Sequence, residues 1–219
     1  DCVLCKFENP KVTVTAIIIK DQKLLVAKRS LQGEPFYGKW DFIGGFLQKG
    51  ETPEEALRRE IKEELGVDSR LTYIGSFTGT SSYKDYVFPV TTLVYLTELV
   101  GKIKLDKKEN SKISWIPLKG LGTIAFDSNQ KILKFLKSKF QYELPRVKKL
   151  ISQLDPSAKI NEQSLYKAML NGYISKIEED GQLVGMGWIF PRQTLLRCQA
   201  VVEDMIVDEG YRGRGYGEK

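Results

Sequence analysis

Apolar and polar positions alternate along the chain in an order that predicts two successive α/β units. Between residues 12 and 20 an alternating pattern runs into a continuous apolar stretch, turns at Asp21-Gln22 and returns through residues 24–26, which predicts a β-hairpin. Further elements are predicted in the order helix 52–65, strands 71–77, 86–99 and 113–116, helices 128–140, 147–154 and 162–170, and strands 173–177, 183–190 and 201–207. The second unit begins near Gln141, and the mixture of helices and strands predicts an α/β (α+β) protein.

The helix predicted at residues 52–65 has strong boundary signals. Thr52 is a favourable N-cap, Glu55 follows three residues later and completes a capping box, and Gly66 lies where a left-handed C-terminal residue is common. Apolar residues recur at every fourth position from Leu57, so one stripe of this helix is expected to pack inward.

Three carboxylates lie on the stripe next to this apolar one. Glu60, Glu63 and Glu64 are spaced so that they share one side of the helix, where like charges repel. A divalent cation would explain the cluster. The alternative is a surface ion-pair network with the basic residues of the same helix, Arg58, Arg59 and Lys62.

The composition restricts the chemistry further. The 219 residues include no histidine, which excludes Ser-His-Asp and Cys-His mechanisms and histidine-ligated metals. A catalytic metal would need carboxylate and carbonyl oxygens, which suit Mg²⁺ or Mn²⁺. The cysteines, Cys2, Cys5 and Cys198, are too few for a disulfide framework, so we expect a reducing, cytoplasmic compartment.

Residues 45–67 match a specific pattern around this helix. They read G-F-L-Q-K-G-E-T-P-E-E-A-L-R-R-E-I-K-E-E-L-G-V and fit the Nudix box, G-x5-E-x7-R-E-U-x-E-E-x-G-U with U apolar, at every fixed position. The first unit resembles a Nudix hydrolase domain over residues 8–141. The resemblance implies an α/β/α sandwich with a mixed sheet, and metal-dependent hydrolysis of a pyrophosphate bond by water attack at phosphorus.

The resemblance also implies a role for each residue of the box. In the family, the positions held here by Glu60, Glu63 and Glu64 bind the divalent ions, and a backbone carbonyl near the first glycine, Gly44 or Gly45, often adds an oxygen. Arg59 pairs with an acidic residue and orients a metal-binding carboxylate, and Glu51 usually joins that ionic network. Glu63, Glu64 and Arg59 are therefore the expected catalytic residues, with Mg²⁺ or Mn²⁺ as cofactor.

Two further segments, one that leads into the box and one that follows it, extend the resemblance. Residues 40–46 read W-D-F-I-G-G-F and resemble the family's W-x-x-P-G-G-x lead-in, with Ile43 where Pro is common. Residues 107–118 resemble a late strand in which an acidic residue precedes a W-x-P-L turn. Glu109 falls in that place as a candidate fourth metal ligand or catalytic base, with a solvated loop glutamate as the alternative.

The substrate is predicted only as a class. A nucleoside diphosphate linked to another moiety, of the ADP-ribose, nucleotide-sugar or dinucleotide type, fits the resemblance. Tyr83 lies roughly where diadenosine-polyphosphate members carry a tyrosine. Tyr83 and Tyr86 are candidate base-stacking residues, and ordinary loop or strand packing is the alternative.

Cys2-x-x-Cys5 has the spacing of half a zinc knuckle. Some Nudix proteins carry a four-cysteine ribbon whose last pair lies just before the Asn-Pro that starts the fold, and Asn9-Pro10 follows here. Residues 1–7 are interpreted as a remnant of such a ribbon, with incidental cysteines as the alternative. Two thiolates cannot complete a tetrahedral site, so we expect no structural zinc in this chain.

The second unit ends in a strand followed by a glycine-rich turn. With the V-E-D-x-x-V-D that precedes it, this turn resembles the acetyl-CoA motif of GNAT acetyltransferases, and a flexible glycine-rich tail is the alternative. The resemblance implies that residues 142–219 are the N-terminal half of a GNAT-like domain, and that the pyrophosphate of acetyl-CoA binds at Arg212, Gly213, Arg214, Gly215, Tyr216 and Gly217. Because the rest of that fold is missing, acetyltransferase activity is not expected from these residues, and acetyl-CoA is expected only for a complete second domain.

The distribution of charge and of apolar residues indicates which kinds of partner this protein can bind. Residues 101–150 carry 13 basic and 4 acidic side chains, many of them on the helix predicted at 128–140, at Lys131, Lys134, Lys137 and Lys139. We interpret these lysines as a solvated helix face, with a surface for nucleic acid or an acidic ligand as the alternative. No apolar run reaches 18 residues, so no membrane association is expected. The expected partner is a small-molecule nucleotide, with no specific nucleic acid, and a homodimer is left open.

Two functions therefore remain. The favoured one is a metal-dependent Nudix pyrophosphohydrolase. The alternative is a nucleotide-sensing Nudix module attached to an acetyl-CoA-dependent N-acetyltransferase whose C-terminal half is missing.

Overall fold

The computed structural model describes residues 9–30, 35–83, 86–104, 110–140 and 144–218, in two compact units. The units are Asp1–Lys137 and Ser138–Lys219. The domain boundary expected at 141/142 lies outside the described residues. None of the helices within the described ranges is long and apolar enough to cross a membrane.

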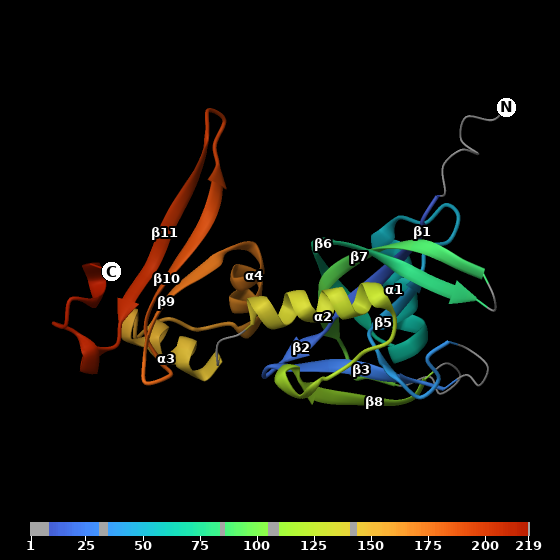
Figure 1. The fold of residues 1–219 in the computed structure, drawn as a ribbon, viewed down its shortest axis with the longest axis horizontal. Coiled ribbons are helices and arrows are strands. Elements are labelled where there is room, and N and C mark those ends of the chain that lie inside the picture. Colours follow the sequence, from blue (N-terminus) through green and yellow to red (C-terminus); the bar gives the residue numbers. More distant parts are fainter. Residues whose placement is uncertain (1–8, 31–34, 84–85, 105–109, 141–143, 219) are drawn as a thin grey trace. The chain divides into compact units, whose positions relative to one another are not determined.

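The first unit contains two sheets (Figure 1). One has the strand order β5-β1-β7-β6, formed by β1 (Lys11–Ile17), β5 (Ile43–Phe46), β6 (Asp68–Tyr83) and β7 (Tyr86–Val100). In it β1 and β7 are parallel and the other pairs are antiparallel, so the sheet is mixed. The second sheet is antiparallel and comprises β2 (Ile19–Lys20), β3 (Lys23–Arg29), β4 (Trp40–Asp41) and β8 (Asn110–Pro117).

The predicted hairpin at the start of the chain is confirmed. Strands β2 and β3 are antiparallel neighbours, and the two residues between them, Asp21 and Gln22, have φ of 47° and 58°. Two consecutive left-handed residues define the kind of turn whose twist matches that of the flanking strands. This turn brings β3 back beside β2, where β3 also pairs with β4 and β8.

Helix α1 (Pro53–Leu65) forms as its boundary signals predict. The Thr52 side chain accepts a hydrogen bond from the Glu55 backbone N–H, the Glu55 carboxylate accepts one from the Thr52 N–H, and Gly66 has φ of 68°. The apolar stripe that begins at Leu57 is fully buried in the core, where it packs with residues of β1, β3 and β5. The packing of this stripe sets the rotation of α1 about its own axis and so determines which way its carboxylates point.

The predicted limits of several strands were wrong. β6 continues to Tyr83 instead of ending at 77, because the polar residues 78–82 pair along their backbones with residues 87–91 of β7 without apolar alternation. Strands β4 and β5 were not predicted, since they are short and β5 contains two glycines. The remaining elements before the second sheet domain are the 3₁₀ turn η2 (Leu118–Gly120) and helix α2 (Asp127–Lys139), which buries Ile132, Leu133 and Leu136 and whose last two residues fall in the second unit.

The second unit begins with two helices and continues into a three-stranded antiparallel sheet of order β11-β10-β9. Its elements are α3 (Leu144–Leu154), α4 (Glu162–Asn171), β9 (Tyr173–Glu179), β10 (Gln182–Gln193), β11 (Cys198–Val207), and the 3₁₀ turns η3 (Glu209–Tyr211) and η4 (Tyr216–Glu218). The predicted elements lie within these bounds. Both helices bury apolar faces, which include Val147, Leu150, Tyr166 and Met169.

Candidate active site

Helix α1 places the three predicted carboxylates in different surroundings. Glu60 and Glu64 lie next to the apolar stripe and are 9% and 6% exposed, whereas the side chain of Glu63 is 55% exposed. Buried carboxylates are unfavourable unless they are hydrogen-bonded or paired with a cation. The structure therefore has to provide partners for Glu60 and Glu64.

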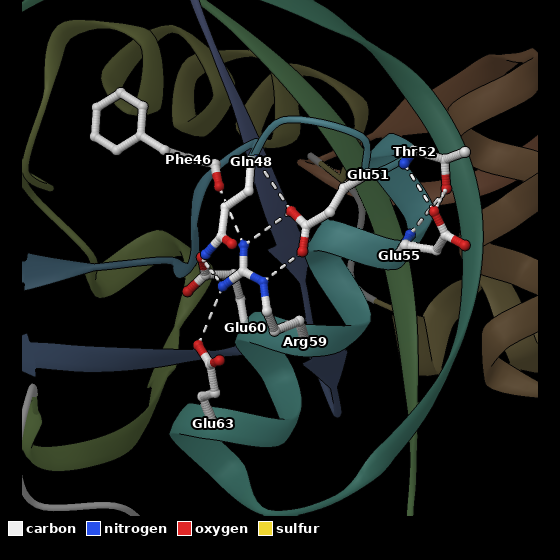
Figure 2. Close-up of polar contacts among 8 residues, drawn as sticks. All are labelled: Phe46, Gln48, Glu51, Thr52, Glu55, Arg59, Glu60 and Glu63. Atoms are coloured by element: carbon white, nitrogen blue, oxygen red, sulfur yellow. Dashed lines mark hydrogen bonds and ion pairs between the residues drawn. The ribbon is translucent and has the colours of Figure 1, made fainter.

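Arg59 is the cation at the centre of this cluster (Figure 2). Its Nε and Nη2 donate to the two carboxylate oxygens of Glu51 at 2.7 and 3.1 Å, a bidentate pair. Its Nη1 donates to Glu60 at 2.8 Å and to Glu63 at 3.1 Å, and Nη2 also donates to the carbonyl of Phe46 at 3.2 Å. One guanidinium thus links three acidic side chains to the strand β5.

The ion pair between Arg59 and Glu51 shifts the pKa values of both side chains. The hydrogen bond from Arg59 lowers the pKa of the Glu51 carboxyl, with a further contribution from the backbone N–H of Gln48. The bond to Glu51 in turn raises the pKa of Arg59 above its already high value, and Glu60 acts in the same direction. Arg59 and Glu51 are therefore charged throughout the neutral pH range.

The glycines of β5 allow the backbone to approach the carboxylates of α1. The N–H of Gly44 donates to Glu64 Oε1 at 3.2 Å. A Cβ on Gly45 would lie 2.4 Å from Glu60 Oε1, a distance that no side chain could tolerate without displacing Glu60. The absence of side chains at these two positions brings Glu60, Glu64 and the backbone of β5 together.

This donor set is chemically suited to a hard divalent cation. Two buried carboxylates lie beside the glycine backbone of β5, and all available ligands are oxygens. Within the described ranges, however, no three acidic, cysteine or histidine side chains lie close enough together to hold a metal ion. In this arrangement the Arg59 guanidinium contacts Glu60 and Glu63 and balances their charge.

A cavity of about 360 Å³ opens beside these groups. Gly44, Gly45 and Glu60 form one part of its lining, and Phe46 at the end of β5 and Gln48 just after it extend this part. Its volume is at the lower end of those of small-molecule binding sites. A small ligand in this cavity would lie directly against Glu60, the member of the carboxylate cluster that lines it.

Sequence reasoning missed a second polar group in the same cavity, formed by Arg29, Asp41 and Asn129. Asp41 Oδ1 accepts hydrogen bonds from Asn129 Nδ2 at 2.7 Å and from the Phe42 N–H at 2.9 Å, and Asp41 Oδ2 lies 3.2 Å from Arg29 Nη1. Asp41, a carboxylate inside the otherwise largely apolar W-D-F-I-G-G segment, was the one sequence signal that could have indicated this polar group.

The carboxyl of Asp41 has an unusual protonation equilibrium. Burial raises its pKa to about 7, although Arg29, Asn129 and the Phe42 N–H all oppose the shift. Between pH 4 and 7 the folded protein therefore holds a proton that the unfolded chain has released. The free energy of unfolding consequently falls as the pH rises through this range, by at most about 1.4 kcal/mol per pH unit.

Asp41→Asn tests this shift. Asparagine keeps an acceptor for Asn129 and Phe42 but cannot ionise, so the free energy of unfolding should depend less steeply on pH in the variant than in the wild type. Urea unfolding at pH 5 and pH 7 measures both slopes. If the wild-type and variant curves run parallel between these pH values, the raised pKa of Asp41 is refuted.

The other predicted site residues lie apart from the cluster or beyond description. Glu109, Cys2 and Cys5 fall outside the described residues, and of Tyr83 only the backbone, in β6, is described. Tyr86 is 63% exposed and stacks on Phe88 with a centroid distance of 5.7 Å. Its side chain does not belong to the described lining of the cavity.

In the second unit the glycine-rich turn follows β11. Gly213 and Gly215 have φ of 76° and 74°, left-handed values that favour glycine. Arg214 and Tyr216 both contact Glu179 of β9, at 3.3 Å for the ion pair and 2.8 Å for the hydroxyl. These contacts fix the turn to the edge of the sheet, and binding of acetyl-CoA there stays a prediction.

Comparison with known proteins identifies the family of each unit. A model of the NUDIX domain matches residues 9–137, more than half of the chain, and a model of the acetyltransferase (GNAT) family matches residues 139–219. The chain therefore belongs to the NUDIX family, and a GNAT domain follows its NUDIX domain. Both predicted resemblances are confirmed.

Individual relatives agree with this assignment. An ADP-ribose pyrophosphatase of Methanocaldococcus jannaschii is 35% identical over 127 residues, which cover 58% of this chain and 72% of that protein. The nucleoside triphosphatase NudI of Enterobacter sp. (strain 638) is 30% identical, over 52% of this chain and 86% of its own length. The crystal structure of a MutT protein from Methanosarcina mazei Go1 has a TM-score of 0.52 at 23% identity, covering 62% of this chain and 99% of that one, which supports the predicted fold.

Proposed function

We propose that the first unit is a metal-dependent pyrophosphohydrolase that cleaves a nucleoside diphosphate linked to another moiety, of the ADP-ribose, nucleotide-sugar or dinucleotide type. The observation that carries this proposal is the convergence of Glu60 and Glu64 on the glycines of β5, beside a cavity of about 360 Å³. Membership of the NUDIX family and relatives named as pyrophosphatase and triphosphatase support it.

The α1 carboxylates are the residues that would hold the metal. Glu60, Glu63 and Glu64 would supply the charged ligands, with the carbonyl of Gly45 as a neutral one, and Glu63, which contacts Arg59 in this structure, would have to move closer to the other two to complete the set. When bound, Mg²⁺ or Mn²⁺ would neutralise phosphate oxygens and lower the pKa of a water molecule. Arg59 donates to Glu60 and Glu63 and would orient both carboxylates toward this task.

The chemical step assigned to the protein is proton removal. Glu63 or Glu64 accepts a proton from water, the water oxygen bonds to phosphorus, and the bridging P–O bond breaks to release two phosphate-containing products. Glu51 holds Arg59 through its bidentate pair and has a positioning role. No histidine is required for any of these roles.

A substrate panel tests the proposed reaction. The purified chain is incubated with ADP-ribose, NADH, a diadenosine polyphosphate and nucleoside triphosphates, each with Mg²⁺ or with EDTA, and nucleotide products are followed. We expect cleavage of a diphosphate-linked nucleotide that requires the metal. Absence of cleavage across the panel would reject the proposal.

A second candidate function rests on the GNAT domain. Residues 139–219 match the acetyltransferase family, and a left-handed glycine turn follows β11. In this alternative the NUDIX domain senses a nucleotide, and acetyl-CoA binds to the GNAT domain at residues 212–217. Nucleotide binding without cleavage, together with acetyl-CoA binding, would favour it.

We also propose a cytoplasmic location, because the three cysteines are too few for a disulfide framework.

A further inference from the structure

The β10–β11 hairpin of the second unit extends beyond the third strand of its sheet (Figure 1). β9 pairs with β10 only as far as Ile189, whereas β10 and β11 stay paired up to Gln193 and Cys198. The outer part of the hairpin is therefore a two-stranded arm. Such an arm is at best marginally stable in water when nothing packs against it.

The tip of this arm, residues 194–197, presents two leucines on a well-bonded turn. The Thr194 hydroxyl accepts hydrogen bonds from the N–H groups of Leu196 and Arg197 at 3.3 and 3.1 Å. The Thr194 N–H donates to the Arg197 carbonyl at 2.8 Å. Leu195 and Leu196 are 104% and 95% exposed. Because the turn holds both side chains away from the protein, only another molecule can bury them, and their burial is favourable.

A cavity of about 300 Å³ lies at the other end of the same hairpin, between α3, α4 and the sheet. Met169, Ile174 and Met186 line it and are buried, so its inner wall is apolar. Trp188 and Asp204 of the hairpin also belong to its lining. Methionine side chains adapt to irregular apolar shapes, so this cavity is suited to branched aliphatic side chains.

The tip of the hairpin cannot fill the cavity of its own chain. Trp188 is the lining residue of β10 that is nearest to the tip. An antiparallel strand advances by about 3.4 Å per residue, so Leu195 lies roughly 20 Å beyond Trp188. Since the strands are paired along this whole distance, the hairpin cannot fold back, and an occupant of the cavity has to come from another molecule.

The two ends of the hairpin carry opposite charge. Arg192 and Arg197 are exposed and flank the two leucines at the tip. Glu203 and Asp204 are exposed at the cavity end, where Lys159 is the one basic side chain among the described residues of the lining. Two such hairpins lying side by side in opposite directions would place each basic tip against the acidic end of the other. A surface that complements itself in this way meets the requirement of a two-fold symmetric interface.

We propose that two copies of this chain associate through antiparallel β10–β11 hairpins, with Leu195 and Leu196 of each copy in the α3–α4 cavity of the other. Apolar burial stabilises the contact, and the opposite charges set its direction. A second copy is the partner that fits best, because one chain supplies both the apolar tip and the apolar cavity. This association goes beyond the hydrolysis proposed for the first unit and does not depend on it.

Sedimentation velocity of the full chain over a range of protein concentrations tests the association. We expect a monomer–dimer equilibrium in the wild type. Leu195→Asp combined with Leu196→Asp should raise the Kd of the dimer at least about a hundredfold, because both tips of a two-fold interface then carry charge into an apolar cavity. Val87→Asp, at an exposed apolar position of the first unit, is the matched control and should change Kd by no more than about twofold.

A second variant blocks the cavity and leaves the tip unchanged. Ser164 is exposed at the edge of the cavity, so Ser164→Trp should weaken the dimer as the tip variant does, and Ala158→Trp serves if the first does not fold. An equal mixture of tip variant and cavity variant retains one intact junction. The labelled tip variant should therefore associate with the cavity variant but not with itself.

Several results would overturn the proposal. One is a wild-type chain that stays monomeric over the whole concentration range, and another is a dimer that the tip variant leaves unchanged. A dimer that is weakened by the tip variant but by neither cavity variant would show that the tip docks elsewhere. A monomeric wild type that binds phosphatidylserine vesicles, when the tip variant does not, would assign the leucines to a lipid surface instead.

Discussion

Glu64→Gln should lower turnover of the diphosphate substrate by at least about a hundredfold, the lower range of what metal and acid–base groups contribute. Glu64 is 6% exposed and its Oε1 accepts a hydrogen bond from the Gly44 N–H. Glutamine has the same volume and can still accept that bond, so the variant loses charge and basicity but keeps its contact with β5. Steady-state kinetics with saturating Mg²⁺ measures the effect.

Glu54→Gln is the matched control for this variant. Glu54 lies on the same helix and accepts a hydrogen bond from the Tyr95 hydroxyl at 2.8 Å, which glutamine can also accept. The same substitution there should leave turnover within about twofold of the wild type. A fully active Glu64→Gln would remove the basis for the metal and base assignments, whatever the control shows.

Glu63→Gln separates the two candidates for the base. Glu63 is half exposed and contacts Arg59, whereas Glu64 is buried against β5. If one of the two variants loses turnover without a change in KM for Mg²⁺, that residue is the proton acceptor, and the other is a ligand.

The residues of the box could be predicted because the information lies within one short segment. Thr52, Glu55 and Gly66 set the limits of α1, and helical periodicity then determines that Glu60 and Glu64 lie beside the buried stripe. Their roles as ligands remain predictions, but the geometry that brings them to Gly44 and Gly45 follows from a local pattern.

The Asp41–Asn129 pair could not be predicted in the same way. The two residues are 88 positions apart, and their hydrogen bond forms only because β4 and the start of α2 line the same cavity. The long β6–β7 hairpin was underestimated for a related reason. Residues 78–82 have no apolar alternation, and their strand conformation depends on backbone pairing with β7.

Leu57→Ala should lower the free energy of unfolding by about 2–5 kcal/mol, because it removes three buried carbons and leaves a cavity. Leu57 is fully buried in the core cluster, packed with residues of β1, β3 and β5 that cannot close the gap without moving the sheet. At a temperature where the variant is folded, turnover should fall much less than in Glu64→Gln, since no charged group of the site is changed.

Arg58→Ala provides the control for the effect of alanine on this helix. Arg58 is the next residue along the helix and is exposed, so its removal should change the free energy of unfolding by no more than about 0.5 kcal/mol. Urea unfolding of both variants measures the difference. Equal stabilities would mean that the stripe beginning at Leu57 does not anchor α1, and the orientation of the carboxylates would then need another explanation.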